Sequence, residues 1–239
     1  LIQKKGSTAV LPFFMALMDN KRLVDYLSGF ITNQRREAFE RVLQQRTRYI
    51  TVVLEDIYQP HNASAVLRSM DCFGIQDAHI IENSNEYRIN PEVALGASKW
   101  LSLMRYNEAG NNTTRALKHL KDRGYRLVAT TPHQQDVELP DFSLEKGKTA
   151  LLFGTEMEGL SQQALSMADE YLRIPMYGFT ESFNISVSAA IILYELKKKL
   201  VRSSVRWALD EEEKTELMLQ WLKKSIKRSD LLIKQFLSK

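Results

Sequence analysis

The sequence predicts an α/β fold with a largely parallel sheet. Through the middle of the chain, short apolar segments rich in β-branched residues alternate with helical patterns, and this alternation is typical of βα units. Several of these segments are apolar at almost every position, as expected of strands that are covered on both faces. The predicted strands are residues 51–57, 78–83, 102–107, 125–131, 149–155 and 171–176.

Helical patterns fill most of the intervals between the predicted strands. Short polar side chains satisfy the free N–H groups of a first helical turn, so they mark where these helices begin. We expect Asn62 or Ser64 to cap the first helix, Asn112 or Thr113 the second, and Ser161 the third. The predicted helices are residues 61–74, 112–123, 161–168 and 184–203.

The last of these helices is unusual. Residues 189–194 leave no polar face, so a helix here is expected to be buried. Its beginning is nevertheless rich in hydroxyl and amide groups, among them Ser182, Asn184 and Ser186. One helix cap needs fewer such groups. We therefore expect the remaining ones to face a ligand.

Helical sequence also precedes and follows the α/β segment. We divide the chain into a basic N-terminal helical extension (1–48), a central domain (49–203) and a basic C-terminal helical extension (204–239). Within the extensions, helices are expected over residues 33–46, 210–224 and 225–237. The helix over 33–46 places its apolar residues on one face, and four arginines lie largely off that face: Arg35, Arg36, Arg41 and Arg46.

Charged residues follow a similar three-part pattern along the chain, with basic flanks and an acidic centre. Residues 1–48 carry nine Lys and Arg against four Asp and Glu, residues 49–196 carry twelve against nineteen, and residues 197–239 carry twelve against six. Basic flanks attract nucleic-acid phosphates, because neutralising phosphate charge releases counterions. Lysine-rich surface helices give the same pattern without any such partner, so charge alone does not decide between the two readings.

Composition limits the class of protein. The single cysteine, Cys72, cannot form an internal disulfide, and it fits a reducing compartment and a cytoplasmic location. The longest apolar run, residues 9–18, is shorter than the ~18 residues of a membrane span and lacks a following cleavage site, so we expect a docked helix and no membrane association. The four histidines show no metal-ligand spacing, and we expect no metal.

Three predicted strand ends carry unusual residues, and ligands bind at the carboxyl ends of strands in an open parallel sheet. After the first strand, Asn62 and Arg68 lie at the start of a helix, where an arginine suits a phosphate. A capped helix with a solvated arginine is the ordinary alternative. After the fifth strand, Glu156 lies between Gly154 and Gly159. The three segments are residues 59–74, 153–161 and 174–188.

No glycine-rich nucleotide fingerprint occurs in the chain, which argues against a nicotinamide-dependent enzyme. Together, however, the three segments resemble the motifs of the SpoU/TrmH family of RNA ribose 2′-O-methyltransferases, in the SPOUT class. The matching stretches are "HNASAVLR", "LLFGTEMEGL" and "IPMYGFTESFNISVS", and the resemblance covers about residues 35–239. The sequence departs from the family pattern at Gln59, Phe183 and Ile185, where Lys, Leu and Val are usual.

The resemblance implies an α/β sheet with a C-terminal trefoil knot, S-adenosylmethionine as methyl donor, and no metal. It also implies a homodimer in which both subunits supply catalytic groups. "QPHN" and "GASKWL" are most similar to the TrmH branch, which methylates a D-loop guanosine ribose in tRNA. The same chemistry on ribosomal RNA and a non-catalytic RNA-binding protein are the alternatives.

By resemblance, five residues are expected to be catalytic: Arg68, Asn62, Glu156, Asn184 and Ser182. The residues expected to bind the methyl donor are Thr130, Gly154, Ile174, Met176, Phe183 and Ser188. Those expected to bind RNA are Arg35, Arg36, Arg41 and Lys99. In the mechanism proposed for this family, the matching arginine is the general base. A guanidinium stays protonated at neutral pH, however, so Arg68 is better suited to binding a phosphate or stabilising an alkoxide. Glu156 is the other candidate proton acceptor, or a partner that holds Arg68.

Overall fold

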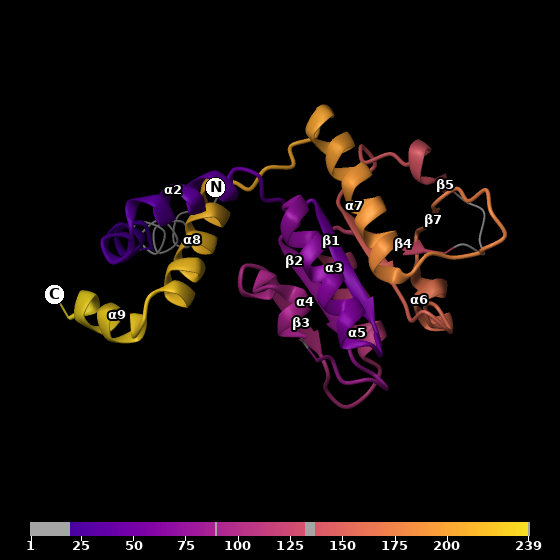
Figure 1. Cartoon of the computed structure of the whole chain (residues 1–239), viewed down its shortest axis with the longest axis horizontal. Helices are drawn as coiled ribbons and strands as arrows, with labels where there is room; N and C mark the ends of the chain where they lie inside the picture. Colours follow the sequence, from indigo (N-terminus) through magenta and orange to yellow (C-terminus); the bar gives the residue numbers. More distant parts are fainter. Residues whose placement is uncertain (1–19, 89, 132–136, 239) are drawn as a thin grey trace, which may run out of the picture. The chain divides into compact units, whose positions relative to one another are not determined.

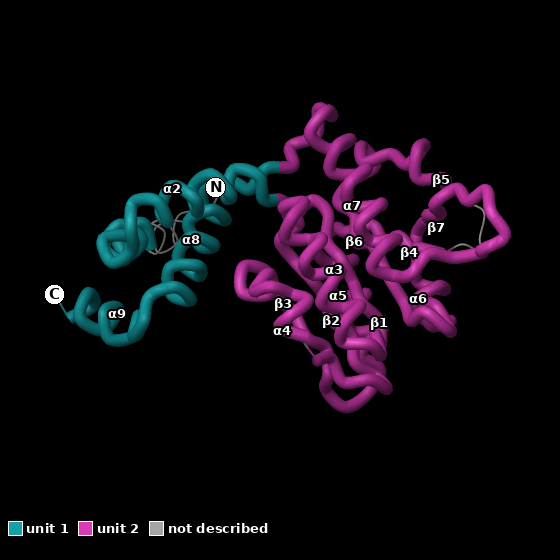
Figure 2. Tube along the Cα trace, in the orientation of Figure 1, with its two compact units in different colours: residues 1–46, 208–239 teal, residues 47–207 magenta. Residues whose placement is uncertain are grey.

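The computed structural model describes residues 20–88, 90–131 and 137–238, and the chain divides into two compact units (Figure 2). One unit is continuous and spans Thr47–Trp207. The other combines the residues before it, up to Arg46, with the residues after it, from Ala208. The helix predicted over residues 9–18 lies outside the described residues.

The continuous unit contains a seven-stranded sheet in which every pairing is parallel (Figure 1). Its strand order is β3-β2-β1-β6-β4-β7-β5. All six predicted strands are present, and each ends one to three residues before its predicted end. The strands are β1 (Ile50–Glu55), β2 (Asp77–Ile81), β3 (Ser102–Tyr106), β4 (Arg126–Thr130), β5 (Val137–Glu138), β6 (Thr149–Phe153) and β7 (Glu170–Arg173).

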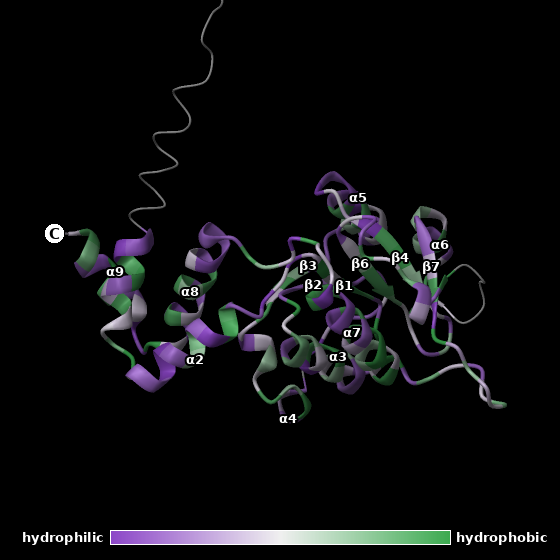
Figure 3. Cartoon of the chain, turned by 90° about the horizontal axis from the view of Figure 1, so that it is seen from above, coloured by the Kyte–Doolittle hydropathy of each residue, from purple (hydrophilic) through white to green (hydrophobic). Residues whose placement is uncertain are grey.

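Helices cover both faces of this sheet. On one face α3 (Pro60–Phe73) and α7 (Ile185–Arg202) pack side by side (Figure 1), and α5 (Asn112–Asp122) and α6 (Gln162–Met167) cover the other. The strands between them are largely hydrophobic (Figure 3), which explains why they lack the alternating pattern of a half-exposed sheet. Two short elements that the sequence did not predict, α4 (Pro91–Ala94) and η1 (Ala97–Lys99), pack against α3.

Two of the predicted helix caps were wrong. The residue that precedes α3 is Gln59, and its side chain makes no capping hydrogen bond. Pro60 starts this helix instead, because its fixed φ is already helical and it has no N–H group to satisfy. The cap of α5 is Asn111, whose side-chain oxygen accepts a hydrogen bond from the backbone N–H of Thr114 at 2.8 Å.

The cap of α6 is the one predicted, and α7 is capped by one of the polar residues noted at its start. The Ser161 hydroxyl accepts from the backbone N–H of Ala164 at 3.1 Å. The Asn184 side-chain oxygen accepts from the backbone N–H of Ser186 at 2.8 Å. Both capping residues lie within segments that the sequence singled out, and capping fixes where the loop in each segment ends.

The prediction that α7 is buried on all sides was wrong. Val187, Tyr194 and Val201 are 43, 56 and 53% exposed. The ring of Tyr194 contacts Phe73 of α3 edge-on, with ring centroids 6.1 Å apart. The α3–α7 layer therefore buries one side of α7 against the sheet and leaves apolar side chains on the other.

The second unit is helical. It contains residues 20–28 in helical conformation, α2 (Asn33–Leu43), α8 (Glu211–Ser225) and α9 (Ser229–Leu237). Phe39 of α2 packs edge-on against Trp221 of α8, with ring centroids 5.5 Å apart. The last helix starts four residues later than predicted, because Arg228 adopts a left-handed conformation before it.

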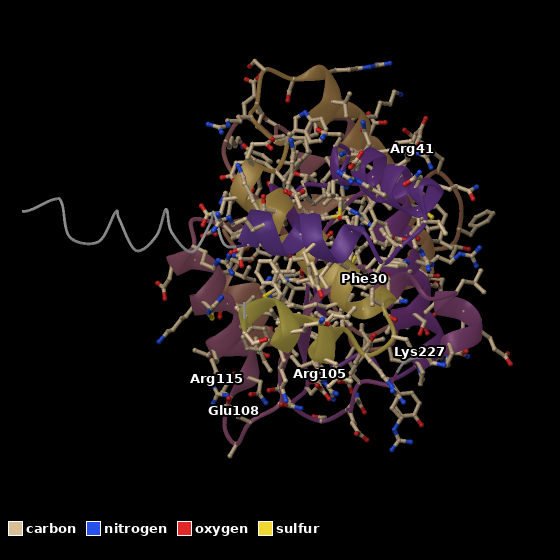
Figure 4. All side chains as sticks on the ribbon, turned by 90° about the vertical axis from the view of Figure 1, so that its left-hand side faces the viewer. Phe30, Arg41, Arg105, Glu108, Arg115 and Lys227 are labelled. Carbon is tan, nitrogen blue, oxygen red and sulfur yellow. The ribbon has the colours of Figure 1, made fainter. Side chains whose placement is uncertain are left out.

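Arg46 does not lie off the apolar face as predicted. It is 2% exposed, and its guanidinium lies 5.4 Å from the centre of the Trp221 ring. The helical phase did not apply to this residue because α2 is already capped at Gln44. Arg41, which is inside the helix, is exposed at the surface as predicted (Figure 4).

A buried histidine lies between the sheet and α5. His79 of β2 is 2% exposed, and its Nδ1 lies 2.9 Å from the hydroxyl of Tyr106 on β3. The ring of His119 on α5 lies 6.4 Å away, centre to centre. Burial, and then the nearby charges of His119 and Arg123, lower the pKa of His79 to about 3.

This histidine makes stability depend on pH. The unfolded chain takes up a proton near the ordinary histidine pKa of 6.5, whereas folded His79 takes one up only near 3. Its contribution is therefore complete above about pH 6.5 and is lost as the pH falls from 6.5 towards 3, at up to about 1.4 kcal/mol per pH unit. We expect His79→Asn, which keeps a partner for Tyr106, to unfold in urea with a flatter pH dependence between 5 and 6.5. The same substitution at exposed His61 controls for the loss of a histidine; equal slopes in all three proteins would contradict the prediction.

Candidate functional site

A pocket lies at the carboxyl ends of β6, β4 and β7, which are neighbours in the sheet, and α7 begins beside it. Its volume of about 260 Å³ is close to the lower end of the range for small-molecule sites. The pocket is lined by Thr130, Thr131, Phe153, Gly154, Thr155, Glu156, Met157, Glu158, Gly159, Leu160, Leu165, Leu172, Arg173, Ile174, Met176, Ser182, Phe183, Ile185, Ser188 and Ile192.

The loop after β6 forms one wall of the pocket as a tight reverse turn. Thr155 and Gly159 exchange two backbone hydrogen bonds, of 2.9 and 3.0 Å. A Cβ atom on Gly154 would lie 2.1 Å from the backbone carbon and oxygen of Gly159, so only glycine fits there. Gly159 itself has a φ of +71°, which also favours glycine. The two glycines therefore determine the shape of this wall.

The structure brings all six residues that were expected to bind the methyl donor to this one pocket. They come from the end of β4, the loop after β6, the segment after β7 and the first turn of α7: Thr130, Gly154, Ile174, Met176, Phe183 and Ser188. Two of the expected catalytic residues, Glu156 and Ser182, also line it. Sequence reasoning missed Glu158, although it belongs to the selected segment 153–161, and Arg173, which lies one residue before the selected segment 174–188.

Three of the expected catalytic residues form a hydrogen-bonded network. The Asn62 side-chain amide donates to Glu156 Oε1 at 2.8 Å, and the Asn184 amide donates to the same oxygen at 2.5 Å. Asn184 also donates to the side-chain oxygen of Asn62 at 3.2 Å. Asn62 is 3% exposed, whereas Glu156 and Asn184 are exposed. The network therefore fixes one oxygen of a carboxylate that faces solvent, and the side chain of Glu156 also borders the pocket.

Arg68 is not part of this network. It lies on α3 six residues after Asn62, which at 100° per residue places it about 120° away around the helix. It is exposed and does not line the pocket. The alternative that Glu156 is a partner that holds Arg68 finds no contact between them among the described residues.

The residues expected to bind RNA fall in both compact units. Arg35, Arg36 and Arg41 are exposed on α2, and Arg36 pairs with Glu40 at 2.9 Å. Lys99 is exposed in η1, with its ammonium group 4.9 Å from the centre of the Trp100 ring. All four side chains are positioned to meet a partner, and their role stays a prediction.

Salt bridges also order the loops that follow β2 and β3, at the opposite edge of the sheet from β7 and β5. Arg105 of β3 binds the Glu82 carboxylate through two nitrogens, each at 2.8 Å, and this pairing lowers the pKa of Glu82. Arg115 at the start of α5 pairs with Glu108 at 2.8 Å (Figure 4). These pairs fix the loops that follow β2 and β3 without contributing to the lining of the pocket.

Within the described residues, no group of three or more His, Cys, Asp and Glu side chains could hold a metal ion. Nor does any described helix combine the length and apolar character needed to cross a membrane.

Comparison with known families identifies the segment that builds this site. Residues 49–194 match the model of the SpoU rRNA Methylase family. The chain belongs to this family. A relative from Borreliella burgdorferi, named tRNA (guanosine(18)-2'-O)-methyltransferase, is 42% identical over 209 residues, which cover 87% of this chain and 94% of the relative.

Solved structures of SpoU methyltransferases share the fold. The TrmH/SpoU tRNA modifying enzyme of Aquifex aeolicus superposes with a TM-score of 0.71 at 28% identity, covering 81% of this chain and 98% of that enzyme. AviRb of Streptomyces viridochromogenes, solved in complex with the cofactor AdoMet, gives a TM-score of 0.52 at 23% identity, with 67% and 61% coverage. The expected α/β architecture with a parallel sheet is therefore confirmed.

The turn at Gly154 yields a test of the pocket wall. We expect Gly154→Ala to lower the free energy of unfolding by about 1–3 kcal/mol, because the new Cβ forces the backbone of Gly159 to move. Gly178→Ala is the matched control, since a Cβ there meets nothing within 4 Å, and it should change stability by less than about 0.5 kcal/mol. Urea denaturation of both variants measures the difference, and equal effects would mean that the wall is not tightly packed.

Proposed function

We propose that this SpoU family member transfers a methyl group from S-adenosylmethionine to the 2′-hydroxyl of a ribose in tRNA, most specifically a D-loop guanosine. The observation that carries the proposal is the position of the Asn62–Glu156–Asn184 network beside the pocket. The names of the relatives support the choice of tRNA over ribosomal RNA.

The lining of the pocket suits this donor. S-adenosylmethionine supplies an electrophilic methyl group on a positively charged sulfur. Ile174, Met176 and Phe183 provide apolar surface, and Thr130 and Ser188 provide hydroxyls. Gly154 packs directly against the backbone of Gly159, which fixes the turn that walls this side of the pocket. We therefore assign these residues to donor binding and assign no metal.

The network prepares a proton acceptor. Both amides donate to Oε1 of Glu156, and within the described contacts its Oε2 accepts no hydrogen bond. A carboxylate held in this way can take the proton of a ribose hydroxyl placed at the mouth of the pocket. Ser182, on the pocket lining, is suited to orient that hydroxyl or the donor.

We propose that Arg68 acts in the site of a second subunit. It lies outside its own chain's network, and the neighbouring α3–α7 surface exposes the apolar side chains that a homodimer would cover. There the guanidinium would bind an RNA phosphate and stabilise the developing alkoxide. In this proposal the segment between β7 and α7 forms the trefoil knot.

The RNA would extend beyond the pocket. Exposed aromatic rings follow β7, with Tyr177 at 97% and Phe179 at 107% exposure, and rings of this kind stack on unpaired bases. The basic helical extensions, with Arg35, Arg36 and Arg41, would bind phosphates, as would Lys99. A cytoplasmic location would fit a tRNA substrate.

The first experiment supplies tritiated S-adenosylmethionine with unmodified tRNA transcripts and ribosomal RNA fragments. We expect label at one D-loop ribose of tRNA, mapped by the resistance of the methylated linkage to alkaline hydrolysis. Glu156→Gln should slow methylation about 100-fold or more if Glu156 accepts the proton, whereas Glu181→Gln, in the exposed segment before α7, should not. Label on ribosomal RNA alone would favour the alternative that the enzyme methylates ribosomal RNA. Binding of the donor with no label on any RNA would contradict the proposal.

Mixed dimers test whether Arg68 acts across subunits. In a dimer of one Arg68→Ala chain and one Asn184→Ala chain, the first chain keeps an intact Asn184 and the second an intact Arg68. If Arg68 acts across subunits, these two residues meet in one site, and one of the two sites is restored. Each variant alone should be inactive. Mixed Glu156→Ala and Asn184→Ala dimers are the control and should stay inactive, because both residues belong to one network. A mixture of the first pair that stays inactive would place Arg68 in its own chain's site.

A further inference from the structure

A second carboxylate lies at the carboxyl end of β1, the strand that pairs with β6. Glu55 is the last residue of that strand and is only 2% exposed. A buried carboxylate is costly unless donors surround it. Glu55 Oε1 accepts from the hydroxyls of Thr113 at 2.5 Å and Ser161 at 2.7 Å, and its Oε2 accepts from the backbone N–H of Ser161 at 2.9 Å.

Two of these three hydrogen bonds hold the end of the pocket wall. Ser161 directly follows Leu160, the last residue of the loop that lines the pocket after β6. The same Ser161 hydroxyl accepts from the backbone N–H of Ala164 and so caps α6, which contributes Leu165 to the lining. Glu55 therefore fixes both the loop and the start of the helix beside it.

The third hydrogen bond ties this assembly to the scaffold. Thr113 lies in the first turn of α5, and its hydroxyl also accepts from the Asn83 side-chain amide at 2.9 Å. Asn83 in turn donates through its backbone N–H to Asp56 at 2.7 Å. A continuous set of hydrogen bonds thus runs from the loop after β2, through α5 and Glu55, to the loop that carries Glu156.

Glu55 does not itself line the pocket. The loop that Glu55 anchors carries Glu156, which does line it. The loop is also held by the backbone pairing of Thr155 with Gly159, which shapes the turn, and by the Asn62 and Asn184 amides that bind Glu156. Neither of these restraints acts at its far end, where Ser161 binds Glu55. Removing the Glu55 carboxylate would take away the acceptor of the Ser161 N–H and hydroxyl, and would free the end of the loop to move.

We propose that Glu55 is a positioning residue of the donor site, which anchors residues 154–161 so that Gly154 and Glu156 keep their places at the pocket. The inference rests on the proposed function, because it takes this pocket to be the site of the methyl donor. Glu55 acts through Ser161 and touches neither donor nor RNA.

The experiment compares two buried carboxylates in the full-length protein. Glu55→Ala removes the anchor, and Glu82→Ala is the matched control: Glu82 is 8% exposed, follows β2, and binds Arg105 away from the pocket. Both should lower the melting temperature. Only Glu55→Ala should weaken binding of S-adenosylhomocysteine, measured by calorimetry, by about tenfold, the equivalent of one lost hydrogen bond to a charged group. Glu55→Gln, which still offers an oxygen to the Ser161 N–H, should recover most of the affinity.

Amide hydrogen exchange supplies a readout that does not require any ligand. We expect faster exchange at residues 155–161 in Glu55→Ala and unchanged exchange there in Glu82→Ala. If Glu55→Ala does not fold, Thr113→Val and Ser161→Ala, which each remove one hydroxyl donor to Glu55, carry the same comparison: only Ser161→Ala should raise the dissociation constant.

Equal affinity and equal exchange in the Glu55 and Glu82 variants would overturn the inference and leave Glu55 a purely structural residue. A parent protein that binds no S-adenosylhomocysteine would instead contradict the proposed function. The exchange measurement would then still decide whether Glu55 anchors the loop.

Discussion

The position of β6 between β1 and β4 is the constraint on which the site depends. Its pairings with both neighbours are parallel, so the carboxyl ends of β1, β6 and β4 lie along one edge, with β7 next to β4. Residues that are about 90 or more positions apart in sequence, such as Asn62 and Glu156, meet there. Had β6 been added at an outer edge of the sheet, the same motifs would lie on different strand ends and no network would form.

The two carboxylates at this edge differ in burial. Asn62 and Asn184 orient an exposed carboxylate, Glu156, that borders the pocket. Glu55, at the end of the neighbouring strand β1, is buried and satisfied by hydroxyl and backbone donors. In such an arrangement the exposed carboxylate is available for chemistry, while the buried one determines where the loop that carries it can lie.

Much of this could be predicted from the sequence, because the relevant signals are local. Continuous apolar runs mark the covered strands, and the short stretches around Asn62, Gly154 and Asn184 carry the motifs. What local patterns could not give was the direction of side chains. Arg68 is close to Asn62 in sequence, yet helical geometry points it away from the network. Asn62, expected as a cap, uses its amide for Glu156, a residue far along the chain.

The other wrong or absent predictions also arise because tertiary contacts cannot be seen in local sequence. Arg46 was assigned by helical phase, but its chain segment has already left the helix, and Trp221 covers it. Tyr194 looked like a core residue because hydrophobicity does not distinguish a covered face from one left for a partner. Glu55 gave no sequence signal, since a single carboxylate at a strand end is common and only its three donors make it informative.

The pairing of α2 with α8 has a consequence for how the protein is made. These two helices pack through Phe39 and Trp221, which are separated by the whole of the α/β unit. During synthesis, α2 emerges from the ribosome long before α8 exists, whereas the central unit can fold as soon as its own residues are complete. The helical unit therefore has a high contact order and must close last. Until α8 has been released, Phe39 of α2 lacks its Trp221 partner, and this apolar surface of the helical unit is open to aggregation and proteolysis in that interval.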